Sequence, residues 1–113
     1  MSKSLQEGKP LTMPVNTIAT GLSPPYVEEL PFRICQKYVE GILLVPEAAI
    51  VQAMKDLYRQ GIVVEPSAAV TYAALALGLV PNTKGRKVAA ILTGGNISPQ
   101  ELLEHFVDHT SRI

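Results

Sequence analysis

The chain has 113 residues, of which 47% are hydrophobic, so it can bury one modest core and corresponds to a single domain or part of one. Ten basic residues balance ten acidic ones, which argues against nucleic acid or anionic lipid as a partner. Cys35 is the only cysteine, which excludes an internal disulfide and predicts a buried structural thiol. The first residues lack the apolar run of a secretory signal, and the alanine-rich stretch 68–80 is too short to cross a bilayer. We therefore expect a cytoplasmic protein without a membrane partner.

Residues 1–113 are expected to form a single incomplete domain in two parts. Residues 1–31 hold most of the prolines and show little periodicity, which predicts loop, extended segment or short helix. Residues 32–113 show helical and strand patterns in alternation. The first of these is a helix over 30–38, because Leu30, Ile34 and Tyr38 recur four residues apart.

A short strand and two further helices are predicted next. Residues 42–45 are apolar at every position, as is typical of a strand covered on both faces in a parallel sheet. Pro46 and Glu47 then open a helix that runs to Gly61. Its apolar side chains fall on one face: Ile50, Val51, Met54, Leu57 and Tyr58. Residues 62–65 are apolar but too short to assign, and an alanine-rich helix begins at Pro66 and ends near Gly78.

The last third predicts a turn, a second strand and a final helix. Residues 81–85 are typical of a turn, and the apolar run 88–92 predicts a second strand. Ser98 and Glu101 have the spacing of a capping box, with Pro99 at the first helical position. The alternation favours an α/β fold with a partial, mainly parallel sheet flanked by helices. The strands are fewer than such a sheet normally has.

Two places in this pattern could bind a ligand. The loop 93–96 follows the second strand at its carboxyl end, where open α/β sheets bind ligands. Gly94 and Gly95 would let the main chain approach a flat ligand, and Thr93 offers a hydroxyl, although an ordinary turn has the same composition. Glu65 opens an apolar helix, where an unpaired carboxylate would be costly, but it could also be a solvated helix-terminus residue.

The two histidines do not predict a metal site. His105 and His109 are four residues apart, a spacing that could direct both imidazoles to one metal ion. Phe106 occupies the position where a zinc protease has its glutamate, so we expect an ordinary solvent-facing pair. The serine, cysteine and histidine residues also lack the context of a hydrolase triad.

Three segments, in this order, resemble the fold-type-II pyridoxal-phosphate family that contains serine and threonine dehydratases and serine racemase. They are residues 17–22 (Thr-Ile-Ala-Thr-Gly-Leu), 64–69 (Val-Glu-Pro-Ser-Ala-Ala) and 91–96 (Ile-Leu-Thr-Gly-Gly-Asn). Residues 5–10 resemble the linker before the first segment, so the resemblance covers nearly the whole chain. It implies pyridoxal phosphate as cofactor, a segment from the C-terminal part of the cofactor domain, and elimination of water from a hydroxy amino acid.

The resemblance also implies roles for individual residues. Thr93 would face the pyridine nitrogen of the cofactor, and Glu65 would lie beside the ring. Gly94 and Gly95 would make room for the ring, and Asn96 would brace the turn. A neutral hydroxyl does not hold the pyridine nitrogen protonated, which makes the ring a milder electron sink suited to β-elimination of water.

The chain departs from the family pattern in ways that imply inactivity on its own. None of its lysines lies in the Ser-x-Lys context of the family's Schiff-base lysine. The glycine-rich phosphate loop and the acidic divalent-metal motif, both expected upstream of Met1, are absent. Thr20 replaces the aspartate of the family's Thr-Ile-Ala-Asp-Gly motif. Covalent catalysis would therefore stop at its first step.

Three functional interpretations follow. The chain could be a dehydratase segment that acts on a small amino acid once its missing part is present in a longer form or in trans. It could instead be a non-catalytic truncated isoform or pseudoenzyme that forms a homo-oligomer or associates with full-length family members. It could also be a small-metabolite-binding module that uses the Thr93 loop. Upstream coding sequence with a Ser-x-Lys motif would favour the dehydratase segment. A start codon confirmed at Met1 would favour the non-catalytic isoform, and stabilisation of the chain by a ligand would favour the metabolite-binding module.

Overall fold

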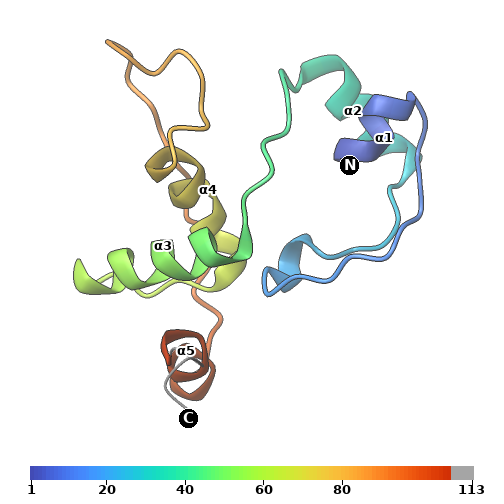
Figure 1. The fold of residues 1–113 in the computed structure, drawn as a ribbon. Helices are drawn as coiled ribbons and strands as arrows, with labels where there is room; N and C mark the ends of the chain where they lie inside the picture. The colour runs from blue at the N-terminus through green and yellow to red at the C-terminus, as the bar shows by residue number, and fades with distance from the viewer. Residues whose placement is uncertain (108–113) are drawn as a thin grey trace.

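The computed structural model describes residues 1–107, and the regular elements in this range are helices (Figure 1). The helices are α1 (Ser2–Glu7), the 3₁₀ turn η1 (Thr20–Leu22), α2 (Glu29–Tyr38), α3 (Glu47–Arg59), α4 (Pro66–Ala76) and α5 (Pro99–Phe106). The last four confirm the four helices predicted from the sequence. Within the described range, no helix has both the length and the hydropathy needed to cross a membrane.

The hydrophobic core lies between α3 and α4. Buried side chains in α3 recur at the spacing of one helical face, and those in α4 are alanines that let the two helices approach closely. The core residues are Ile50, Ala53, Met54 and Leu57 from α3, Ala68, Ala69 and Ala73 from α4, Val64 before α4, and Ala19 from the N-terminal third. Met54 is the largest fully buried side chain, at 1% exposure. The core therefore depends on two helices that are neighbours in sequence and on one residue that is not.

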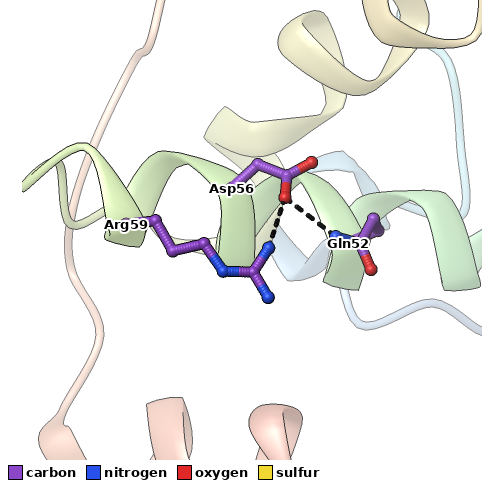
Figure 2. A network of polar contacts seen from close by, with 3 residues as sticks. All are labelled: Gln52, Asp56 and Arg59. Carbon is purple, nitrogen blue, oxygen red and sulfur yellow. Dashed lines mark hydrogen bonds and ion pairs between the residues drawn. The ribbon is translucent and has the colours of Figure 1, made fainter.

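The outer face of α3 is polar. Figure 2 shows the Asp56 carboxylate accepting hydrogen bonds from the Gln52 amide and from the Arg59 guanidinium, each at 2.8 Å. The three side chains lie one helical turn apart on the side of α3 away from the core. This division between a polar and an apolar face confirms the amphipathic helix predicted here.

Helix α5 begins with the predicted capping box. The Ser98 hydroxyl accepts a hydrogen bond from the Glu101 amide at 3.2 Å, and the Glu101 carboxylate accepts one from the Ser98 amide at 2.8 Å. Hydrogen bonds from the Ser98 main chain and hydroxyl hold the pKa of Glu101 below its ordinary value. α5 packs against α3, where the rings of Tyr58 and Phe106 meet edge to face with centroids 5.5 Å apart.

The N-terminal third consists of the contacting helices α1 and α2 and a ribbon, residues 12–26, that extends from them (Figure 1). Thr12 and Tyr26 form an isolated antiparallel bridge, and the Met13 amide donates to the Pro25 carbonyl at 2.7 Å. At its far end the ribbon turns through η1, which contacts α4. The ribbon thus extends from α1 and α2 to the core, and residues 17–22 form its far end.

The predicted strands 42–45 and 88–92 do not form in residues 1–107, so the predicted sheet is absent there. A strand needs a neighbour to pair its main-chain groups, and the described residues supply none to either segment. Leu44 and Ile91 are consequently 75% and 71% exposed. The radius of gyration is 15.7 Å, against about 13 Å for a compact domain of this length. The apolar pattern of segments 42–45 and 88–92 is typical of strands buried on both faces, and residues 1–107 do not bury them in this way.

Candidate functional site

Residues 17–22 lie against the first turns of α3 and α4. The Glu47 carboxylate accepts hydrogen bonds from the Thr17 hydroxyl and from the Ile18 amide, the second at 3.0 Å. At the other end of the segment, the Gly21 amide donates to the Ser67 hydroxyl at 2.9 Å. The segment is therefore attached to two different helices by side chains at their amino ends.

Between these attachments the main chain makes a tight turn at Ala19. This residue has φ −77° and ψ 69°, the conformation of an inverse γ-turn, and the Thr20 amide donates to the Ile18 carbonyl at 2.9 Å. The turn directs the Ala19 methyl group into the core, where it is 1% exposed. Burial of Ala19 and the two side-chain attachments together fix the segment.

Residues 93–95 approach the chain just before α4. The Glu65 amide donates to the Gly94 carbonyl at 3.2 Å. A Cβ atom on Gly94 would lie 2.6 Å from Glu65 Oε1, and one on Gly95 would lie 3.0 Å from the Val63 carbonyl oxygen. Both glycines are thus explained by close packing on residues 63–65, which is a different reason from the ligand approach predicted above.

The first turn of α4 is the point where all three segments of the sequence resemblance meet. Ser67 holds residues 17–22 through its hydroxyl, and Glu65 holds residues 93–95 through its amide. Glu65 is the N-cap residue of α4, but its side chain makes no capping hydrogen bond, and it is half-buried next to Gly94. A carboxylate, a serine hydroxyl and a glycine turn are therefore gathered at one helix terminus.

Thr93 and Asn96 are both exposed on this loop. The turn closes around Asn96 through a hydrogen bond from the Ile97 amide to the Gly95 carbonyl at 2.8 Å. Neither side chain forms a hydrogen bond with another residue of the described range. The structure thus places Glu65 beside Gly94 and leaves Thr93 exposed, and the roles of these residues toward a ligand stay predictions.

Sequence reasoning missed the contacts of Glu47, Thr17 and Ser67. The sequence pattern indicates only that Glu47 favours a helix terminus and that Ser67 belongs to a helix start. Their partners lie 29 to 46 residues away along the chain, so local spacing could not reveal the contacts. The one available signal was that Thr17 and Gly21 belong to the first segment of the resemblance.

Three surface hollows lie elsewhere on the molecule. Their volumes are about 400 Å³ beside α1 and α2, about 480 Å³ between α3 and α5, and about 360 Å³ between α4 and residues 88–91. None of these three is lined by residues 93–96. The candidate site is accordingly an open surface at the start of α4 and not one of these hollows.

The remaining reactive side chains are dispersed. His105 is half-buried in the last turn of α5, and His109 lies outside the described residues. In the part of the chain that the structure describes, no three His, Cys, Asp or Glu side chains gather as a metal site would require. Cys35 was expected to be buried, but it is half-buried on α2, because this helix packs chiefly on the short α1.

Comparison with known proteins gives a consistent set of matches. The family model described as "Pyridoxal-phosphate dependent enzyme" matches residues 1–94. The biosynthetic L-threonine dehydratase IlvA of Halalkalibacterium halodurans is 40% identical over 98 residues, which are 85% of this chain and 23% of that protein. The chain spans about a fifth of the length of the curated threonine dehydratases that it matches.

Solved structures of enzymes named threonine deaminase and serine racemase also resemble this chain. The processed form of threonine deaminase isoform 2 from Solanum lycopersicum superposes with a TM-score of 0.79 at 30% identity, over 92% of this chain and 31% of that one. Serine racemase from Dictyostelium discoideum gives a TM-score of 0.74 at 37% identity, over 86% and 31%. These neighbours agree with the predicted α/β class, whereas the parallel sheet is not confirmed.

Proposed function

The chain belongs to the pyridoxal-phosphate-dependent enzyme family, and we propose that it is a C-terminal cofactor-domain segment of a serine or threonine dehydratase, a lyase that removes water from a small hydroxy amino acid. One observation supports this most directly. The hydrogen bonds from Gly21 to Ser67 and from Glu65 to Gly94 join all three segments of the resemblance at the first turn of α4. Loop segments from different parts of the chain that meet at a helix terminus are typical of a binding site.

The residues at this place fit one edge of pyridoxal phosphate. Thr93 has an exposed hydroxyl, and the close packing of Gly94 and Gly95 on residues 63–65 holds the loop that carries it. Glu65 supplies a carboxylate on the neighbouring segment. When bound, the cofactor supplies an electron sink for elimination at the amino-acid carbons. Thr93 would hydrogen-bond to the pyridine nitrogen without holding it protonated, as a carboxylate would.

The proposed segment does not carry the whole reaction. The chain lacks the Ser-x-Lys context and the glycine-rich phosphate loop, and it spans only 23% of its H. halodurans relative. We therefore propose that residues 1–113 act as part of one domain whose remainder lies in a longer protein or an associated family member. In that setting the apolar segments 42–45 and 88–92 become strands of a parallel sheet, because neighbouring strands then cover them.

The first test is an assay of the chain alone with pyridoxal phosphate and either serine or threonine. No keto acid should form, because no lysine has the required context. Borohydride reduction followed by peptide mapping checks the same point independently. A stoichiometric pyridoxyl label on one lysine, together with turnover, would contradict the proposal that the chain is inactive alone.

The second test substitutes Thr93 in a longer form that restores the missing part. Thr93→Asp should lower the dehydration rate more than it lowers cofactor affinity, because a carboxylate favours the protonated pyridine ring. Thr93→Ser is the matched control and should have little effect, since it keeps the hydroxyl. If the aspartate variant dehydrates substrate as fast as the parent, Thr93 does not contact the ring and the proposed site is wrong.

A further inference from the structure

We propose that Glu47 is a positioning residue, which fixes residues 17–22 against the first turn of α4 and so sets where that segment lies relative to Glu65. A role for this placement in catalysis rests on the proposed function. The contacts of Glu47 do not depend on that proposal. Nothing in the sequence resemblance assigns a role to Glu47.

The geometry of Glu47 suits this task. It is the first residue of α3, so the helix fixes its main chain, and a carboxylate is favourable at this end of the helix dipole. Both of its oxygens are used: one accepts from the Thr17 hydroxyl and the other from the Ile18 amide. One side chain therefore holds two consecutive residues of another segment.

Thr17 passes this constraint along the segment. Its hydroxyl donates to Glu47 and at the same time accepts from the Ala19 amide at 3.1 Å. A hydroxyl that donates to a carboxylate becomes a better acceptor, so the two bonds strengthen each other. The second bond stabilises the inverse γ-turn that buries Ala19.

The far end of the segment has little freedom once this turn is set. The Gly21 amide meets the Ser67 hydroxyl at 2.9 Å, and a Cβ on Gly21 would also lie 2.9 Å from that oxygen. Such a close approach requires the segment to arrive in one orientation. Glu47 at the start and Ser67 at the end thus define its position at the first turn of α4, where Ser67 is separated from Glu65 by a single residue.

The test is amide hydrogen exchange of the 113-residue chain, read at Ile18 and Gly21, with Ala73 in α4 as the internal reference. Glu47→Ala should make both amides exchange about tenfold faster and leave Ala73 unchanged, because a hydrogen bond to a charged group is lost without loss of the α3–α4 core. Glu28→Ala is the matched control, since Glu28 is an exposed helix N-cap residue without a capping hydrogen bond.

Variants of Thr17 separate positioning from general stabilisation. Thr17→Val should reproduce the effect of Glu47→Ala at Gly21, while Thr17→Ser keeps the hydroxyl and should exchange like the parent. The double variant Glu47→Ala with Thr17→Val should speed exchange at Gly21 by less than the product of the two single effects, because the two side chains share the contact between the Glu47 carboxylate and the Thr17 hydroxyl.

Parent-like exchange at Ile18 and Gly21 in Glu47→Ala would overturn the inference. An equal loss of protection at Ala73 in Glu47→Ala would also overturn it, since Glu47 would then stabilise the whole core. A parent chain without protection at Ala73 would overturn it as well. These readouts involve no cofactor, so their failure is distinct from failure of the proposed function, which the Thr93 variants report.

Discussion

The core face of the α3–α4 pair and the open segments 42–45 and 88–92 are both apolar, yet the core face is buried and the open segments are largely exposed. Met54 in α3 is 1% exposed, whereas Leu44 is 75% exposed. A helix satisfies its own main-chain hydrogen bonds and needs a partner for one face only, and α3 finds that partner in the next helix along the chain. A buried strand needs neighbours at both edges and both faces, and apolar sequence cannot replace them.

The largest expected effect is the difference between two truncations, one in the α3–α4 core and one in segment 42–45. Met54→Ala should lower the free energy of unfolding by about 2 to 4 kcal/mol, because it leaves a cavity between α3 and α4. Leu44→Ala should change it by no more than about 0.5 kcal/mol, because that side chain is already in solvent. Urea titration followed by far-ultraviolet circular dichroism measures both. Equal losses would mean that Leu44 is covered in solution and that the contrast between the regions is wrong.

The second effect concerns the contact between residues 93–95 and residues 63–65. Gly95→Ala should destabilise the chain by about 1 to 2 kcal/mol, because the new methyl group meets the Val63 carbonyl, which is main chain and yields little. Gly94→Ala should cost less, because it meets the end of the Glu65 side chain, which can rotate away. Amide exchange at Glu65 in the two variants tests this order, and a larger effect at Gly94 would contradict it.

The third effect tests whether α5 depends on its own cap. Ser98→Ala removes the hydroxyl that accepts from the Glu101 amide, and should destabilise α5 by about 1 kcal/mol. The change should appear as faster amide exchange in α5, with α4 as the reference. Unchanged exchange in α5 would show that packing on α3, and not the cap, sets its stability.

Acid gives an independent check on the same capping box. The Ser98 hydrogen bonds keep the pKa of Glu101 lower in the folded chain than in the unfolded chain. The associated stabilisation is therefore fully present above the unfolded pKa and is lost as the pH falls through the folded pKa. Glu101 protonation, followed by NMR, should occur at lower pH in the parent than in Ser98→Ala, because the variant lacks one of the hydrogen bonds that favour the charged form.

The smallest effect is expected on the polar face of α3. Asp56→Ala removes both contacts drawn in Figure 2, yet should lower the free energy of unfolding by about 0.5 kcal/mol or less, because the Arg59 side chain is 66% exposed and its ion pair is screened by solvent. Urea titration at low and high salt measures it. A loss as large as that of Met54→Ala at both salt concentrations would require a buried network at this position.

Features that depend on residues close together in the sequence, such as helix caps and helix faces, could be predicted from the sequence. The capping box of Ser98 and Glu101 and most of the buried face of α3 were predictable because the residues involved lie within a few helical turns of one another, although Tyr58 is 50% exposed. The contacts of Glu47 and Ser67 were not, because a hydrogen bond across 29 to 46 residues leaves no periodic trace. The site residues were predictable only from the family resemblance, and the physical reason for Gly94 and Gly95 required knowing that residues 63–65 pass beside them.

The burial of Ala19 within a core built mainly from α3 and α4 constrains the order in which the chain can fold. The two helices are adjacent in sequence, so their packing closes only a short loop and can form early. Ala19 can enter its place only after that surface exists, and its arrival closes a much longer loop through the ribbon and α2. Residues 17–22 should therefore dock after α3 and α4 have packed together, and detach before these two helices separate.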